Sequence, residues 1–211
     1  MQIILASSNT HKAKEFQDKL QSNSVEVQLC SALGIQIESD VEKYHTYYQN
    51  AEAKCNAVYQ QLKDPDSSMI VADDSGIEVS ILGNLPGVRS ARFASTGKDQ
   101  DNRKKLLHLL RSYTFAQKKC HFTCVLCCRY QKRIYYFEGR VNGFILGFER
   151  GCGGFGYDPI FYYPPFSKTF AQIPSDLKNQ VSHRGRALDK LRMFVESTKG
   201  GTRTHTRFNP H

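Results

Sequence analysis

The chain has 211 residues, of which 40% are hydrophobic and 23% are charged, and its formal net charge is +9. These proportions are typical of a globular protein with a buried core, and they exclude an intrinsically disordered chain. No apolar run reaches the ~18 residues of a membrane span, and the start MQIILASSN lacks the basic residues that open a signal peptide. We therefore expect a cytoplasmic protein without membrane contact.

The predicted elements alternate between strands and helices along the chain. Short apolar runs and period-two alternation indicate strands, whereas apolar residues at helical spacing indicate amphipathic helices. We expect strands at 2–6, 25–29, 69–72, 77–82 and 144–149, a hairpin of 121–129 with 133–140, and helices at 10–20, 46–62, 101–110 and 182–196. This order predicts an α/β fold with a mixed sheet.

Residues 1–197 are expected to form the folded part of the chain, and 198–211 a separate tail. The tail is polar, basic and without periodicity, which is typical of a disordered segment or a foreign extension. Other basic runs, at 103–105, 118–119 and 132–133, are short and scattered, and such runs are usually solvated. We therefore expect an anionic small substrate and no nucleic-acid partner.

Four of the seven cysteines, at positions 120, 124, 127 and 128, cluster in one segment, where the alternation at 121–129 suits a strand. The Cys124-x-x-Cys127 pair has no second pair or His-x-x-x-His to complete a zinc site. We expect these thiols to face a core.

Four motifs carry the chemistry, and the first follows the first predicted strand. Ser7, Asn9 and Lys12 stand where a helix begins, and the free N–H groups of a helical first turn bind phosphate. A lysine there adds a mobile point charge that suits a triphosphate. The alternative is that Asn9 only caps the helix and Lys12 is solvated, because the glycines of a P-loop are absent.

The second motif is the pair Asp73 and Asp74, at the end of a buried strand. Adjacent residues on extended backbone point to opposite sides, so one carboxylate can face a substrate while the other supports the turn. A carboxylate in that position can bind Mg²⁺ and orient water for attack on phosphorus. An acidic turn before Gly76 is the alternative.

The third and fourth motifs supply rings and a basic residue. The run Gly153–Phe161 places Phe155, Tyr157 and Asp158 on a Gly-rich loop, where an aromatic ring can stack on a base. Arg184, next to His183 at the start of the last predicted helix, has donors that suit a purine 6-oxo group. A core phenylalanine and a surface arginine are the alternatives.

Taken together, the segments LASSNTHKAKEF, VADDSGIEV, LPGVRSARFA, GGFGYDPIF, KTFAQ and LKNQVSHRGRAL resemble the inosine triphosphate pyrophosphatase family. The resemblance runs from residue 2 to about 196. It implies hydrolysis of ITP, dITP and XTP to monophosphate and pyrophosphate with Mg²⁺. It also implies a two-lobed α/β fold with a mixed sheet, flanking helices and the active-site cleft between the lobes, and usually a homodimer.

The resemblance also assigns roles to individual residues. Asp74 would be the proton acceptor and a metal ligand. The residues that would contact the substrate are Ser7, Ser8, Asn9, Thr10, His11, Lys12, Ser75, Phe155, Gly156, Tyr157, Asp158, Lys178, His183 and Arg184.

Two positions depart from the family pattern, since Gln49 and Gln172 stand where glutamates are usual. If Gln49 replaces a metal ligand, Mg²⁺ affinity falls, because Mg²⁺ prefers charged oxygens. Glu52, one turn away, would compensate only with a backbone shift. The rival prediction is therefore a catalytically weak protein that sequesters its nucleotide, and a nucleic-acid binder is a third possibility.

Overall fold

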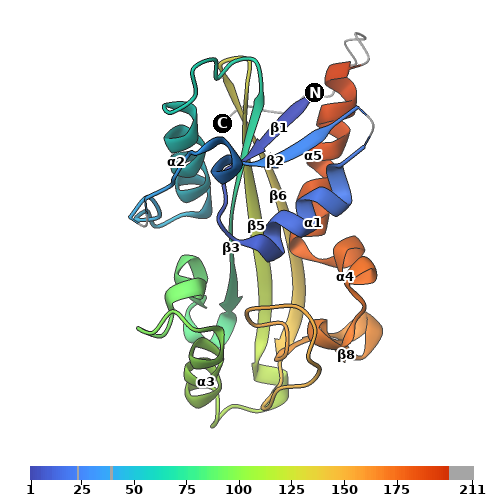
Figure 1. The fold of residues 1–211 in the computed structure, drawn as a ribbon. Coiled ribbons are helices and arrows are strands. Elements are labelled where there is room, and N and C mark those ends of the chain that lie inside the picture. The colour runs from blue at the N-terminus through green and yellow to red at the C-terminus, as the bar shows by residue number, and fades with distance from the viewer. Residues whose placement is uncertain (23, 39, 200–211) are drawn as a thin grey trace. The chain divides into compact units, whose positions relative to one another are not determined.

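The structure is a computed structural model that describes residues 1–22, 24–38 and 40–199 (Figure 1). In these residues eight strands form one sheet of order β2-β1-β3-β5-β6-β7-β8, with β4 paired to β3. The strands are β1 (Gln2–Leu5), β2 (Glu26–Leu29), β3 (Met69–Val79), β4 (Leu85–Pro86), β5 (Lys119–Tyr130), β6 (Arg133–Ile145), β7 (Phe161–Tyr163) and β8 (Lys168–Thr169).

The sheet is mixed, as predicted. Strand β1 pairs in parallel with β2 and β3, whereas β6, β7 and β8 pair in antiparallel succession. The α-helices are α1 (Thr10–Leu20), α2 (Tyr47–Tyr59), α3 (Asp99–Leu109), α4 (Ser175–Val181) and α5 (His183–Lys199). The α/β class with flanking helices is therefore confirmed.

The chain divides into two compact units, and β3, β5 and β6 each contribute residues to both. Unit 1 comprises Met1–Asp74, Cys124–Gly139 and the described chain from Arg184 onward. Unit 2 comprises Ser75–Thr123 and Arg140–His183. The chain thus changes unit four times, two of them between Asp74 and Ser75 and between His183 and Arg184. A cleft between two lobes stays a prediction.

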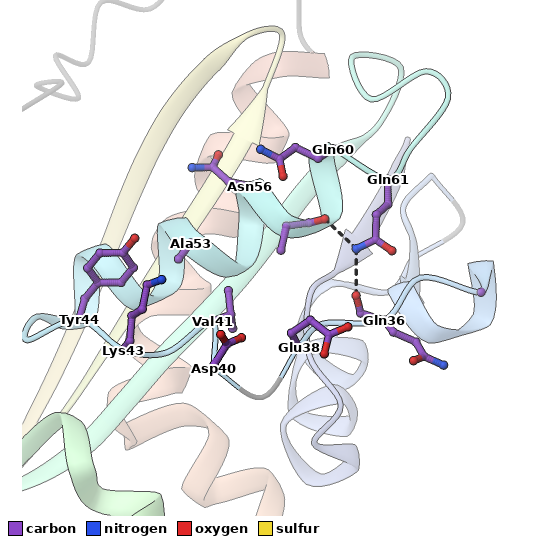
Figure 2. Close-up of a pocket in the computed structure, with 12 residues that line it drawn as sticks. Gln36, Glu38, Asp40, Val41, Lys43, Tyr44, Ala53, Asn56, Gln60 and Gln61 are labelled. Carbon is purple, nitrogen blue, oxygen red and sulfur yellow. Dashed lines mark hydrogen bonds between the residues drawn. The ribbon is translucent and has the colours of Figure 1, made fainter.

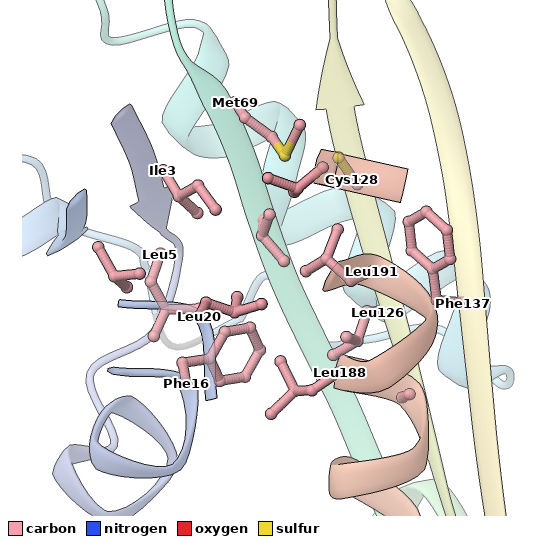
Figure 3. Packing of buried hydrophobic residues seen from close by; sticks show 14 of the residues in the cluster. Ile3, Leu5, Phe16, Leu20, Met69, Leu126, Cys128, Phe137, Leu188 and Leu191 are labelled. Atoms are coloured by element: carbon pink, nitrogen blue, oxygen red, sulfur yellow. The ribbon is translucent and has the colours of Figure 1, made fainter. Parts of the chain in front are cut away.

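Unit 1 has a hydrophobic cluster on each face of its strands. Phe16 of α1 and Leu188 and Leu191 of α5 pack with Ile3 and Leu126 on one face (Figure 3). The other face packs against α2 through Ala51, Cys55 and Val58, with Cys127 from β5. Because strand side chains alternate, Cys127 lies in one cluster and Cys124 and Cys128 in the other, which confirms that these thiols face a core.

Unit 2 has one hydrophobic cluster, which contains a group of aromatic rings in contact. Phe122 of β5 packs against Phe161 and Phe170, with centroid distances of 4.7 and 6.2 Å. Leu106 of α3 and Ile77 of β3 complete the same cluster. This core supports the Gly-rich loop, because Tyr157, Ile160 and Phe161 all belong to it.

Two predicted strand boundaries are wrong. Residues 144–149 do not form a separate strand, because β6 is continuous to Ile145 and no strand follows directly. Gly143 does not end the strand. It lets β6 lie close to β7, since a Cβ at this position would lie 2.5 Å from the carbonyl oxygen of Tyr162. Likewise β3 does not end at Asp73 but runs on to Val79.

Helix α5 continues to Lys199, so the first two residues assigned to the tail are helical. The rest of that segment, 200–211, lies outside the described residues. Among the described helices, none has the length and apolar character needed to cross a membrane.

Candidate functional site

The two aspartates of β3 point to opposite sides, as predicted, and each has its own partners. Lys12 Nζ of α1 lies 2.9 Å from Asp73 Oδ2, while Asn50 of α2 donates to Asp74 Oδ2 at 3.0 Å. Both carboxylates are buried, and they lie in the middle of a strand and not at its end. Polar partners from three helices make this possible, because a buried charge needs a paired or hydrogen-bonded neighbour.

Asp73 is fixed as an anion. Burial alone would raise the pKa of this carboxyl, but the charges of Lys12, Arg184 and Lys54 hold it well below its usual range. Arg184 donates to Asp73 Oδ2 from Nε and Nη2, at 3.3 and 3.2 Å, and Lys54 Nζ donates to the Asp73 carbonyl oxygen. Asp73 is therefore the anionic centre of a buried cluster of cations.

Arg184 lies inside unit 1, with only 2% of its surface exposed. Besides Asp73, it meets Glu15 of α1, whose Oε2 lies 2.6 Å from Nη1. The sequence predicts that this arginine reads a purine, but in the structure these donors serve two carboxylates of unit 1. This arrangement supports a role in holding Asp73, and through it Lys12.

Asp74 has the opposite electrostatic setting. Burial raises its pKa to about 6, and the nearby charge of Glu42 adds to this, while Lys54, Lys12 and the Asn50 hydrogen bond act against the rise. Glu42 also forms an ion pair with Lys54, whose Nζ lies 2.6 Å from Glu42 Oε1. A carboxyl that titrates just below neutral pH is suited to accept a proton from water.

Glu42 is an acidic residue near Asp74 that the sequence analysis did not single out. It lies in the segment before α2, where no helical or strand periodicity marks it, and an acidic residue just ahead of the Thr46 cap was the available signal.

Gln49 takes part in the N-cap of α2. Its backbone N–H donates to Thr46 Oγ1, and its Oε1 accepts from the same hydroxyl. Glu52 accepts a hydrogen bond from Tyr136.

The carboxylate pair fits a divalent cation. In the described part of the chain no three His, Cys, Asp or Glu side chains are grouped closely enough to hold a metal ion. Asp74 and Glu42 nevertheless repel one another, and a divalent cation would relieve that repulsion. Mg²⁺ is usually held by one or two carboxylates, with water and substrate phosphate completing its shell.

The segment before α1 has the predicted form of a phosphate cradle. Asn9 caps α1 by accepting from the Lys12 backbone N–H at 3.1 Å, and Ser7 Oγ accepts from the Asn9 N–H at 3.2 Å. Ser8, Thr10 and His11 are exposed. The predicted cap is therefore confirmed, whereas phosphate binding stays a prediction.

In unit 2 the structure brings Phe155, Asp158 and Lys178 together. Asp158 Oδ2 accepts from the Phe155 N–H at 2.9 Å and lies 2.6 Å from Lys178 Nζ. The same ammonium lies 4.8 Å from the centroid of the Phe155 ring. Gly154 makes this possible, since its φ is +70° and a Cβ there would lie 2.1 Å from Asp158 Oδ2.

Helix α4, which carries Lys178, was not predicted. A helix of seven residues is too short to show a clear hydrophobic period in the sequence, although Pro174 stands at its start.

Two further predicted residues of unit 2, Tyr157 and His183, are held by contacts with their neighbours. Tyr157 donates to the Ser90 carbonyl at 2.8 Å, and the buried His183 stacks on Phe122 at a centroid distance of 4.5 Å.

Three more predicted positions have clear surroundings. Gly156 is bound by helix α3, and Ser75 is partly exposed on β3. Gln172 is part of a turn, since its Oε1 accepts from the Thr169 N–H at 3.0 Å.

A cavity of about 670 Å³ lies elsewhere in unit 1, between the segment around 34–44 and α2 with the turn after it (Figure 2). Gln61 ties the two walls together by donating to the carbonyl oxygens of Gln36 and Ala57, each at 2.9 Å. Among the described residues, none of the predicted site residues lines this cavity. The candidate residues lie instead at the Asp73–Asp74 centre of unit 1 and, separately, in the Gly-rich loop of unit 2.

These features define an α/β protein with a buried, cation-rich carboxylate centre in one unit and an aromatic, lysine-bearing loop in the other. Residues 3–194 match the model of the Ham1 family, and the chain belongs to that family. This match confirms the resemblance drawn from the sequence motifs.

Curated relatives and solved structures agree with this assignment. The dITP/XTP pyrophosphatase of Clostridium perfringens is 40% identical over 193 residues, which cover 90% of this chain and 94% of that protein. The Ham1 protein of Staphylococcus aureus has a TM-score of 0.82 and 34% identity, covering 94% of this chain and all of that one. A nucleoside-triphosphatase, or dITP/XTP pyrophosphatase, of Mycobacterium abscessus has a TM-score of 0.70 and 32% identity, covering 90% of this chain and 98% of that one.

Proposed function

We propose that the chain hydrolyses dITP, XTP and ITP between the α- and β-phosphates, giving a nucleoside monophosphate and pyrophosphate. The observation that carries the proposal is the pair of adjacent aspartates in opposite electrostatic settings, one a fixed anion and one with a pKa raised to about 6. The relatives named dITP/XTP pyrophosphatase support the substrate class.

Asp74 is the proton acceptor in this proposal. Above pH 6 its carboxylate is largely ionised, yet burial keeps it basic enough to take a proton from an attacking water. Asn50 holds one of its oxygens, which fixes the direction of the other. Asp73, one residue away, has the wrong electrostatics for this task, since its cations hold its pKa low.

The cofactor in this proposal is Mg²⁺, held by Asp74 and Glu42. When bound, it would neutralise part of the charge on the triphosphate and on the leaving pyrophosphate. Lys54 Nζ lies 2.6 Å from Glu42 Oε1 and holds that carboxylate in place.

The start of α1 binds the phosphates. Its free N–H groups and the Ser7 hydroxyl are donors for phosphate oxygens, and Lys12 adds a charge. Asp73 holds Lys12 in place through an ion pair of 2.9 Å, and Arg184 in turn holds Asp73. Ser8, Thr10 and His11 are exposed on the same segment and belong to the proposed phosphate contacts.

The Gly-rich loop recognises the nucleoside. The Phe155 ring offers a stacking face, and Lys178, held by Asp158, offers a donor for the 6-oxo group of hypoxanthine or xanthine. Adenine carries a 6-amino donor there, which cannot accept a hydrogen bond from the ammonium, and this disfavours ATP. GTP shares the 6-oxo group, so its 2-amino group must be what is rejected. Ser75, Gly156, Tyr157 and His183 remain the other proposed contact positions, and Arg184 would act indirectly, by holding Asp73.

A protein that sequesters its nucleotide without turnover was the rival prediction, and it rested on Gln49. The contacts of Gln49 with Thr46 and the position of Glu42 near Asp74 remove much of that support. A steady-state assay with dITP, XTP, ITP, ATP and GTP and Mg²⁺ separates the two. Pyrophosphate release from the first three supports hydrolysis, whereas tight binding without turnover supports sequestration.

A homodimer in the cytoplasm, without nucleic-acid or membrane partners, completes the proposal. Light scattering at working concentration tests the dimer. Binding to long DNA with a steep salt dependence would contradict the absence of a nucleic-acid partner.

A further inference from the structure

Helix α3 holds the Gly-rich loop of unit 2 through both backbone polar groups of one residue, Gly156. Asp99 Oδ2 accepts from the Gly156 N–H at 2.7 Å, and Arg103 Nη1 donates to the Gly156 carbonyl oxygen, also at 2.7 Å. Asp99 and Arg103 are four residues apart, so they lie on the same side of the helix. Both bonds involve a charged side chain and are therefore stronger than neutral ones.

Arg103 also grips the chain just before the loop. Its Nε lies 2.8 Å from Glu149 Oε1 and its Nη2 lies 3.2 Å from Glu149 Oε2. This two-point contact fixes the plane of the guanidinium group, and with it the direction of the Nη1 bond to Gly156. One arginine thus joins the entry of the loop to its centre.

The loop needs such external support because its own backbone is unusually free. Gly151, Gly154 and Gly156 all have positive φ, at +82°, +70° and +61°. Glycine loses more conformational entropy on ordering than any other residue. Gly156 stands between Phe155 and Tyr157, and its N–H and C=O belong to the two peptide units that join it to them. Holding both groups therefore restrains the backbone that carries both rings.

We propose that Asp99 and Arg103 are positioning residues that set nucleoside selectivity by clamping Gly156. The clamp acts through Phe155 and through the Asp158–Lys178 pair, and it touches none of the phosphate chemistry of unit 1. The proposal rests on the proposed function for its kinetic consequence, but the clamp itself is testable without any substrate.

Hydrogen exchange of the loop amides in the full-length protein tests the clamp directly. In Asp99→Ala the Gly156 N–H loses its acceptor, so its exchange should be roughly tenfold faster, the effect of one lost hydrogen bond. Asp101→Ala is the matched control, because Asp101 is also in the first turn of α3 but accepts from Thr96 Oγ1 at 2.7 Å. Asp99→Asn retains an acceptor and should restore slow exchange. Equal exchange in Asp99→Ala and Asp101→Ala would overturn the clamp.

Kinetics then test its purpose. In Asp99→Ala and Arg103→Ala we expect KM for ITP to rise roughly tenfold, with kcat within about twofold and a smaller preference for ITP over ATP. Lys104→Ala, the exposed neighbouring cation, is the control for lost charge. Faster exchange with unchanged KM and unchanged preference would overturn the link to selectivity. A wild type that releases no pyrophosphate would overturn the proposed function, while the exchange result would still stand.

Discussion

The substitution Asp74→Asn should abolish turnover and at the same time stabilise the metal-free protein. Burial and the charge of Glu42 raise the pKa of Asp74 from 3.8 to about 6, so folding disfavours its ionised form. A raised carboxyl pKa contributes stability below the unfolded value, and that contribution is lost as pH rises through 6. Asparagine never ionises, so the variant avoids this loss.

The size of the gain follows from the shift. A change of about 2 pKa units corresponds to about 3 kcal/mol, at 1.36 kcal/mol per unit. For a chain of this length that should raise Tm by about 6–12 °C at pH 8, and by little at pH 4, where the carboxyl is protonated in the folded state and already partly protonated in the unfolded one. Thermal unfolding of wild type and variant across this pH range, with a chelator present, measures the difference.

Asp73→Asn is the matched control, one residue away on the same strand. Its pKa is held low by Lys12 and Arg184, so its removal leaves buried cations without their anion and should destabilise by about 3–5 kcal/mol. A destabilised Asp74→Asn at pH 8, or a gain that does not change with pH, would refute this account of the Asp74 environment. Turnover like that of wild type would refute its role as proton acceptor.

Three further substitutions probe the rest of the site. Lys12→Ala should weaken calorimetric binding of ITP at least tenfold more than binding of inosine monophosphate, the effect of one charged hydrogen bond, and an equal loss would place Lys12 away from the phosphate tail. Glu42→Gln should raise the Mg²⁺ dissociation constant roughly tenfold, whereas Gln49→Glu should leave it unchanged, and a Mg²⁺ titration measures both effects. If Gln49→Glu changed the constant and Glu42→Gln did not, position 49 and not position 42 would lie beside the metal. Gly154→Ala forces a Cβ to 2.1 Å from Asp158 Oδ2 at φ +70°, so it should lower Tm, and an unchanged melting curve would contradict the observed loop geometry.

Elements with a single strong pattern were predictable from the sequence. The helix at 10–20 matches α1 because Ala13, Phe16 and Leu20 form one buried stripe and Asn9 caps it. The predicted strand at 69–72 was shorter than β3 because the interior of β3 carries Asp73 and Asp74. A local sequence pattern cannot show that Lys12, Lys54 and Arg184 neutralise them.

The site was predictable where a motif is local and not where it depends on distant partners. Phe155 and Asp158 are three residues apart, so the sequence alone is enough to identify the loop. Arg184 is indistinguishable from a surface arginine until Glu15, 169 positions away, is seen to contact it. Glu42 was missed for the same reason, since its importance comes from Asp74 and Lys54.

The measurement that tests the central claim most directly is the phosphate product released from dITP in the presence of Mg²⁺. We predict one pyrophosphate and one dIMP per dITP consumed, with no orthophosphate, and the loss of this release in Asp74→Asn. Orthophosphate with dIDP as products, or equal turnover of dITP and dATP, would contradict the account.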